Sequence, residues 1–445
     1  MTLNFLKNVF RLKNLSYLAL FFVLAISTDL LAGGLEAAEA APAVSAEVAY
    51  ILNTFLFLVC GFLVMFMAAG FCMLEAGQVR SKNTAVICLK NIGLFSIAGI
   101  MYYLVGYNLM YDGVDGGYLG SFSIFARSSE VDLETGYASA SDWYFQMVFV
   151  ATAASIVSGA LAERILIWPF FLFVALLTGI IYPIAGSWQW GGGWLSEAGF
   201  SDFAGSTLVH SVGGWAALSG AIILGAREGK FNDDGTANTF AGCSVPLTTL
   251  GVFILWLGWF GFNGGSQLAM GTADDAIAVS TIFINTFLAG AGGVLCAAAI
   301  TRLQFGKTDV IQMLNGCIGG LVGITAEPLM PSPLAAILIG AVGGLIVVYG
   351  TKLLFSLKID DVVGAVPAHL FAGIWGTLIV PATNADASFS TQLVGVLAVN
   401  IFVFFVAYIV FSLMKATVGL RLSKEGETKG TDVTETGVIA YAIRD

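Results

Sequence analysis

The chain has 445 residues, of which 58% are hydrophobic and 11% charged, and its mean hydropathy is +0.87. Soluble globular domains carry roughly 25% charged residues, so this composition excludes a water-soluble globule. The formal net charge of −10, with no basic stripe in the sequence, argues against nucleic-acid binding. We therefore interpret the chain as an all-α integral membrane protein.

The first 41 residues have the pattern of a leader. Lys7, Arg11 and Lys13 precede an apolar stretch from Leu15 to Ile26, and small residues follow around Ala37. This order is typical of a secretory signal peptide that is cleaved from the mature protein. The alternative is an additional, twelfth membrane helix.

Eleven long stretches without Asp, Glu, Lys or Arg follow the leader. A helix needs about 20 residues to span the hydrocarbon core of a bilayer. The pattern predicts eleven transmembrane helices in a membrane domain over residues 48–414, followed by a cytoplasmic regulatory tail over residues 415–445. The stretches are 48–74, 91–111, 143–162, 165–196, 203–226, 235–273, 276–301, 310–326, 328–351, 362–385 and 387–414.

Positive charge lies almost entirely on one side of this arrangement. After the even-numbered stretches the only basic residue is Arg127. Because cytoplasmic loops are enriched in Lys and Arg, the pattern predicts that the mature N-terminus lies outside the cell and the C-terminus in the cytoplasm. The expected membrane is the plasma membrane, which is the inner membrane in a bacterium. The connections after the odd-numbered stretches carry Arg80, Lys82, Lys90, Arg164, Arg227, Lys230, Arg302, Lys307, Lys352 and Lys358.

The two histidines of the chain lie in a repeated pattern, D-x-x-G-x4-H-x3-G. It runs from Asp202 to His210 in the fifth stretch and from Asp361 to His369 in the tenth. An odd number of spans separates the copies, so they run in opposite directions through the membrane. This arrangement predicts an inverted repeat of five plus five helices, with the eleventh helix added.

The repeat suggests a geometry for the two histidines. Each Asp can cap the N-terminus of its helix, and each His follows eight residues later, roughly 12 Å along the axis. We expect His210 and His369 to meet near the bilayer centre, without a carboxylate beside them. Two neutral imidazoles suit a small polar molecule such as ammonia or water, although an isolated buried histidine is more often structural.

Aromatic residues could provide a cation site. Phe145 and Phe149 are one helical turn apart, and Trp190 lies near the outer end of the fourth stretch. Aromatic faces bind an ammonium-like cation with about 0.5–2 kcal/mol each. The alternative for the phenylalanines is ordinary core packing.

Five segments along the chain form a recognisable set: Gly159-Ala-Leu-Ala-Glu-Arg164, Trp190-Gly-Gly-Gly193, Asp202-Phe-Ala-Gly-Ser-Thr-Leu-Val-His210, Gly258-Trp-Phe-Gly-Phe-Asn-Gly-Gly-Ser266 and Asp360-Asp361 ahead of His369. They resemble the ammonium transporter (Amt) branch of the Amt/Rh family, in family order across about residues 48–445. The resemblance implies that His210 and His369 line the pore and that Phe145, Phe149 and Phe262 form its gate. It also implies that Trp190, Phe149, Ser266 and Asp202 recruit ammonium outside, Asp202 in a structural or electrostatic role.

The resemblance also implies a homotrimer and a tail that is read by a PII-type signalling protein. The tail keeps Asp432, Glu435 and Gly437, but Thr436 and Val438-Ile439 depart from the family pattern. We expect a non-enzymatic transporter of ammonium, with methylammonium as a second candidate substrate and net proton transfer. Neither a metal nor another cofactor is expected. The alternatives are an ammonium sensor without sustained transport, a passive channel for ammonia or carbon dioxide, and a redox protein whose histidines ligate one haem.

Overall fold

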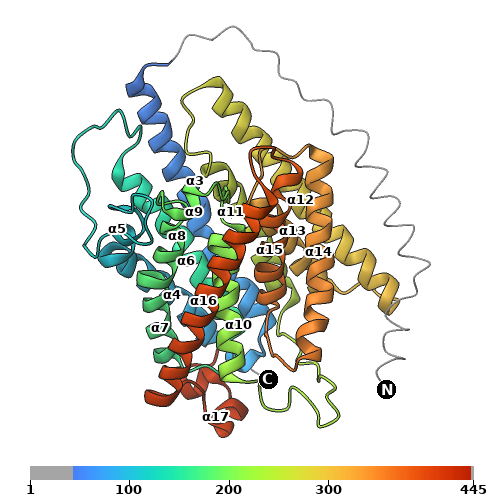
Figure 1. The fold of residues 1–445 in the computed structure, drawn as a ribbon. Helices are drawn as coiled ribbons and strands as arrows, with labels where there is room; N and C mark the ends of the chain where they lie inside the picture. The colour runs from blue at the N-terminus through green and yellow to red at the C-terminus, as the bar shows by residue number, and fades with distance from the viewer. Residues whose placement is uncertain (1–43, 442–445) are drawn as a thin grey trace. The chain divides into compact units, whose positions relative to one another are not determined.

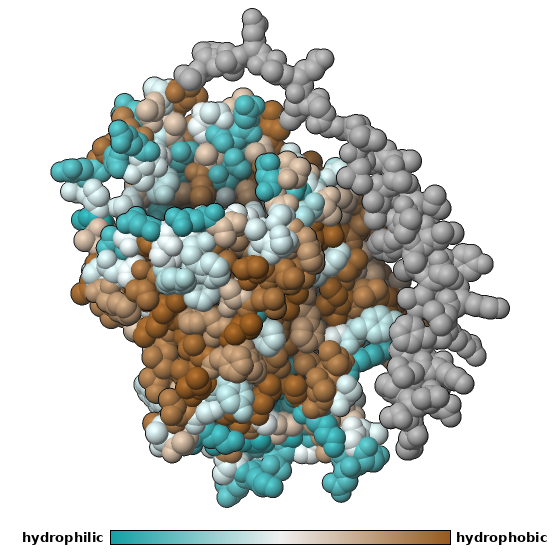
Figure 2. Space-filling model, viewed as in Figure 1, coloured by the Kyte–Doolittle hydropathy of each residue, from teal (hydrophilic) through white to brown (hydrophobic). Residues whose placement is uncertain are grey.

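The computed structural model describes residues 44–441, so the predicted signal peptide lies outside the described residues. Within this range, nine helices are long and apolar enough to cross a membrane, and two shorter apolar helices accompany them. Each of these helices falls on one of the eleven apolar stretches of the sequence. An apolar band with hydrophilic residues above and below it is visible on the face in Figure 2.

The first five stretches form the helices from α3 to α10 (Figure 1). Short π-helical segments, labelled η2 to η4, interrupt several of them, and η1 is a 3₁₀ turn. In chain order the elements are α3 (Ala46–Gln78), η1 (Ser81–Asn83), α4 (Thr84–Met101), η2 (Tyr102–Gly106), α5 (Tyr107–Tyr111), α6 (Ser139–Ala160), α7 (Ile167–Leu176), η3 (Leu177–Ile181), α8 (Tyr182–Ser187), α9 (Trp194–Glu197), η4 (Ser206–Ser211) and α10 (Val212–Leu224).

The remaining stretches form the helices from α11 to α16, and the tail adds two short elements. The segments η5 and η7 are π-helical, and η6 is a 3₁₀ turn. In chain order the elements are α11 (Val245–Gly265), α12 (Ala273–Phe305), α13 (Val310–Thr325), α14 (Pro333–Ser356), η5 (Val366–Phe371), α15 (Ala372–Leu378), η6 (Val380–Ala382), α16 (Phe389–Thr417), α17 (Lys424–Lys429) and η7 (Asp432–Thr436).

Two charged residues that border the predicted stretches lie inside helices: the stretch 48–74 ends just before Glu75, and the stretch 91–111 begins just after Lys90. Glu75 belongs to the last turn of α3, and Lys90 lies in the middle of α4, both buried. Assigning Lys90 to a connection was therefore wrong. Both side chains bond to Ser158 of α6, which explains why the helices continue through them. Buried charges persist where polar partners are supplied.

The two histidine-bearing helices run in opposite directions. The carbonyl of Asp202, just before η4, accepts the indole N–H of Trp190, and the carbonyl of Leu224, at the end of α10, accepts Arg421 of the tail. The chain enters η5 beside Arg227, which pairs with Asp360. We call the end of the bundle at Trp190 the tryptophan end and the end at Arg421 the tail end.

Glycine permits the close crossing of these two helices. A Cβ at Gly373 would lie 2.3 Å from the carbonyl oxygen of Ser206, and a Cβ at Gly214 would lie 2.6 Å from Cβ of Leu370. Gly205 and Gly364 serve a different purpose, since their φ angles of +108° and +76° form the turns into η4 and η5. The repeated glycines thus fix both the entry and the crossing of the two helices.

The described part of the tail packs on the tail end of the bundle. The Asp432 carboxylate accepts the backbone N–H groups of Ala85 and Val86 at the start of α4, each at 2.9 Å. Glu435 accepts the backbone N–H of Ile167 at the start of α7, also at 2.9 Å. A carboxylate at a helix N-terminus satisfies free N–H groups and offsets the helix dipole. The tail therefore caps two helices of the bundle.

A buried ion-pair network lies at the tail end. Arg227 bonds to Asp360 at 2.8 Å and to Glu163 at 2.9 Å, and Glu163 also pairs with Arg80 at 2.6 Å. Burial alone would raise the pKa of Asp360, but hydrogen bonds from Arg227 and the charges of Arg164 and Arg227 hold it well below its usual value. The network fixes the chain just before η5, the segment that carries His369.

Replacing Asp360 by asparagine is expected to destabilise the protein by about 3 kcal/mol at neutral pH, because Arg227 would lose one of its buried charged partners. The native pKa of Asp360 is lowered, so its stabilisation is fully present above the unfolded pKa of about 4 and is lost as the pH falls through the lower native value. Thermal unfolding of the detergent-solubilised protein between pH 8 and pH 3 measures both effects.

Asp233→Asn is the matched control, since Asp233 is exposed at the same end. Its melting temperature should stay close to that of the parent at every pH. A difference between Asp360→Asn and the parent that does not shrink below about pH 4 contradicts the assignment of this carboxylate as charged.

Candidate functional site

His210 and His369 face each other at the crossing of the two interrupted helices. Their Nδ1 atoms are 3.2 Å apart, and their ring centroids are 5.2 Å apart with an interplanar angle of 28°. His210 is completely buried, and only 3% of the His369 surface is exposed. The contact of the two imidazoles was predicted from the repeat, and the structure shows it.

Both histidines lie in π-helical segments, η4 and η5, at matching positions in the two copies of the repeat. A π-helical turn breaks the regular hydrogen-bond ladder and is frequent at functional sites. Among the described residues, Nε2 of His210 has no hydrogen-bond partner, although it is buried. A buried polar atom without a partner is costly, so this nitrogen is available to a small polar ligand.

Aromatic rings form a continuous row from the tryptophan end to the histidines. Trp190 meets Phe149 edge-on at 6.1 Å, and Phe149 stacks on Phe262 at 3.9 Å. Phe262 in turn lies 5.3 Å from the ring of His210. The row therefore connects Trp190 to the histidine pair through three ring contacts.

Phe145 and Phe149 are neighbours but do not stack on each other. Their rings are 4.8 Å apart and tilted by 60°, whereas Phe145 stacks on Phe57 with an interplanar angle of 5°. The stacking partner of Phe149 is Phe262 of α11. The helical spacing of the pair indicated a shared face correctly, but ring orientation depends on α3 and α11, which contribute the other partners.

The carboxylate of Asp202 caps η4. Its two oxygens accept four backbone N–H groups at 2.8–3.1 Å, and the residue is 1% exposed. The donors all belong to the chain from Gly205 to Leu208. In the second copy, Asp361 accepts the N–H groups of Gly364 and Val366. These contacts favour a structural role for Asp202.

Ser266 lies at the C-terminus of α11, one turn beyond Phe262, and donates a hydrogen bond to the Phe262 carbonyl at 2.9 Å. Its side chain is half-buried. The helix α11 thus carries Ser266 toward one end of the bundle while Phe262 lies against His210.

Two further aromatic residues border the histidines and were not singled out from the sequence. Trp259 stacks on His210 at 5.0 Å and donates its indole N–H to Thr325 at 2.8 Å. Phe71 of α3 lies 6.1 Å from the ring of His369. The signal for Trp259 is its position three residues before Phe262, on the same face of α11.

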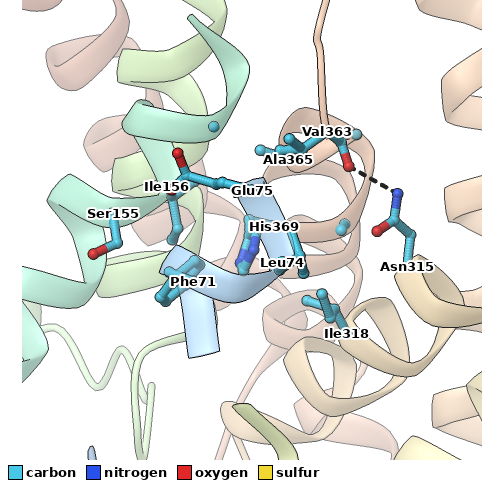
Figure 3. Close-up of a pocket in the computed structure, with 13 residues that line it drawn as sticks. Phe71, Leu74, Glu75, Ser155, Ile156, Asn315, Ile318, Val363, Ala365 and His369 are labelled. Carbon is cyan, nitrogen blue, oxygen red and sulfur yellow. Dashed lines mark hydrogen bonds between the residues drawn. The ribbon is translucent and has the colours of Figure 1, made fainter. Parts of the chain in front are cut away.

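A small cavity of about 10 Å³ lies on the tail side of His369 (Figure 3). His369 and Glu75 both line this cavity. The part of α3 that carries Phe71, Leu74 and Glu75 lies beside the imidazole in Figure 3. The expectation that no carboxylate accompanies the histidines was therefore wrong. Counting charge-free stretches placed Glu75 at a helix boundary, whereas α3 carries it into the cavity wall.

The facing Nδ1 atoms define what the pair can do chemically. One hydrogen is shared between them, so one ring carries its hydrogen on Nδ1 and the other on Nε2. A proton that enters at one Nε2 can move the shared hydrogen across and release a proton from the other Nε2. The 3.2 Å separation does not fit the two axial ligands of one haem iron, since trans bonds of about 2 Å each would hold these nitrogens about 4 Å apart.

The family model of the Ammonium Transporter Family matches residues 55–441. The chain belongs to this family. A Synechocystis protein named as an ammonium transporter is 42% identical over 422 residues, 94% of this chain and 95% of its own. Ammonium transporter Amt2 of Archaeoglobus fulgidus is 39% identical, and the match spans 86% of this chain and 87% of Amt2. This protein is thus a multi-pass membrane protein of a non-enzymatic transporter family.

Solved structures share the fold. A protein named Sensor Amt Protein superimposes with a TM-score of 0.83 at 33% identity and covers 88% of this chain and 99% of its own. Mep2 of Saccharomyces cerevisiae gives a TM-score of 0.76 at 24% identity, covering 90% of this chain and 96% of Mep2. The buried histidine pair agrees with the twin-histidine pore that family membership implies.

Replacing Asp202 by asparagine is expected to destabilise the protein on the order of 3 kcal/mol, because the amide NH₂ would face two of the four backbone N–H groups that the carboxylate accepts. Thermal unfolding in detergent measures the loss. Asp386→Asn, an exposed aspartate ahead of α16, is the control and should leave the melting temperature nearly unchanged. A parent-like melting temperature for Asp202→Asn argues against the capping role.

Proposed function

We propose that this protein transports ammonium by separating it into ammonia and a proton. The single observation that supports this most directly is the Nδ1–Nδ1 contact of His210 and His369 at the end of a buried row of rings. A narrow, largely apolar passage past the two imidazoles favours a cargo that can become neutral. A potassium ion cannot lose its charge and would lack enough oxygen ligands there.

Ammonium is recruited at the tryptophan end in this proposal. Trp190, Phe149 and Ser266 form the outer site, and Asp202 supports it by fixing the entry of η4. The edge-on contact of Trp190 with Phe149 supports a cation–π surface. Phe145, Phe149 and Phe262 form the gate between this site and the histidines. The 3.9 Å stacking of Phe149 on Phe262 supports this gate, and in the proposal these rings move when cargo passes.

Deprotonation follows from desolvation. Burial of a charged amine favours its neutral form, as it lowers the pKa of a lysine by up to about 3–5 units. Ammonia then passes His210 and His369, and the proton uses the shared hydrogen of the pair. Net proton movement with ammonia makes the transport electrogenic.

We further propose that eleven helices span the membrane, with the mature N-terminus outside and the tail in the cytoplasm. The membrane in this proposal is the plasma membrane, which is the inner membrane in a bacterium. The domain boundaries are those of the sequence: a leader over 1–41, a membrane domain over 48–414 and a regulatory tail over 415–445. The opposite directions of η4–α10 and η5–α15 support the inverted repeat. The excess of Lys and Arg at the tail end supports its cytoplasmic location.

The assembly that we propose is a homotrimer with one pore per subunit. Methylammonium is a second proposed substrate of each pore. The tail is a candidate surface for a PII-type regulatory protein. The contacts of Asp432 with α4 and of Glu435 with α7 support a tail that is coupled to the bundle. A displaced tail would lose the caps of both helices.

A sensor is the second candidate function. The similarity to the Sensor Amt Protein favours it, since that chain is matched over 99% of its length. A sensor binds ammonium without a sustained current, and a passive channel for ammonia or carbon dioxide gives uptake without any current. Solid-supported membrane recordings of the reconstituted protein distinguish the three, with ammonium, methylammonium and potassium as test ions.

Replacing His210 by alanine is expected to reduce the ammonium-evoked current about tenfold or more, because acid–base groups placed at a proton-transfer step contribute at least that much. Potassium should evoke no current in the parent. Current recordings on proteoliposomes containing equal amounts of folded protein provide the measurement, with His369→Ala tested in parallel. Unchanged current and selectivity in both variants would rule out the role of the pair.

A further inference from the structure

Glu75 is a buried carboxylate that the proposed transport step does not yet use. It is completely buried near the C-terminus of α3 and lines the cavity that His369 also lines. The cavity wall includes the start of η5 and the end of α6, so it lies on the tail side of the histidine pair. Any proton that leaves His369 toward the tail end enters this region first.

Side chains from two neighbouring helices hold the carboxylate in place. Ser158 of α6 donates its hydroxyl hydrogen to one oxygen at 2.7 Å, and the Asn91 amide of α4 approaches the other at 3.4 Å. Lys90 donates to the Ser158 carbonyl at 2.7 Å. Ser158 therefore separates the carboxylate from the ammonium group of Lys90, and no ion pair joins the two among residues 44–441.

Three other buried carboxylates of the described bundle are bound differently. Glu163 and Asp360 form ion pairs with arginines at 2.6–2.9 Å, and Asp202 accepts four backbone N–H groups. Arginine side chains or several backbone N–H groups thus bind these three carboxylates directly. Glu75 has neither an arginine nor a backbone N–H cap, so it is better placed to exchange a proton.

The cavity offers a route between His369 and Glu75. Its volume of about 10 Å³ suffices for about one water molecule. Polar side chains of Glu75, His369, Ser155 and Asn315 line it, which supplies the two to four partners that a buried water requires. The rest of the lining is mainly apolar, as Figure 3 shows for Leu74, Ile156 and Ile318.

We infer that Glu75 is the proton acceptor on the tail side of the pore, receiving the proton from the histidine pair through a water in this cavity and passing it to ammonia. This inference rests on the proposed electrogenic transport. His369 Nε2–H gives its proton to the water, and the water gives one of its own to the carboxylate. Ammonia that has passed the pair then takes this proton, so that ammonium forms and Glu75 returns to its anion.

The test uses Glu75→Gln, which keeps the length of the side chain and an acceptor for Ser158 but cannot carry a proton. Current and ammonia accumulation are measured in the same proteoliposomes. The current is expected to fall about tenfold or more, while ammonia accumulation stays within about twofold of the parent, because the path for the neutral molecule is intact. The charge moved per ammonia therefore falls.

Glu327→Gln is the matched control, since Glu327 is also buried but follows α13 and is held by Asn384 and two backbone N–H groups. Its ratio of charge to ammonia should equal that of the parent. Glu75→Asp keeps a titratable group and should give a ratio between those of the parent and Glu75→Gln. It also supplies the test if Glu75→Gln does not fold.

A parent-like ratio in Glu75→Gln, or in Glu75→Asp if only this variant folds, overturns the inference. So does an equal loss of current and accumulation, which would indicate a purely structural role. Failure of the proposed function is a separate result, because it would appear as the absence of any ammonium-evoked current in the parent protein.

Discussion

The contact between two imidazoles at the crossing of two interrupted helices is the constraint on which the rest of the site depends. It requires that backbones approach more closely than any side chain allows, and Gly214 and Gly373 provide that space. It also requires that both helices begin at fixed points, which Asp202 and Asp361 ensure by accepting backbone N–H groups. A shift of either helix would separate the two Nδ1 atoms.

Five buried carboxylates of the bundle are bound in three physically distinct ways. Asp202 and Asp361 are satisfied by helix N-termini, Glu163 and Asp360 by arginines, and Glu75 by neutral side-chain donors. The first two arrangements fix a charge and thereby position a helix. The third leaves the charge only partly compensated, next to a cavity and an imidazole, which is where proton exchange has a use.

The described tail contacts two helices of the bundle, and one of them, α4, lies beside Glu75. Its acidic side chains occupy the N-termini of α4 and α7, and α4 carries Lys90, the cation nearest to the Ser158–Glu75 contact. The ion-pair network around Arg227 lies at the same end and fixes the approach to η5. A movement of the tail would therefore be transmitted through α4 and through the chain ahead of η5, which lie on two sides of the cavity.

The sequence by itself determined the apolar helices, the repeat, the capping aspartates and the meeting of the histidines, because hydropathy, capping residues and the spacing of the repeat can be read along the chain. Only the tertiary structure decided that Phe149 stacks on Phe262 rather than Phe145, that the Nδ1 atoms face each other, and that Glu75 and Lys90 lie inside helices. Ring orientation and the partners of a buried charge depend on residues from distant helices, so no local pattern specifies them.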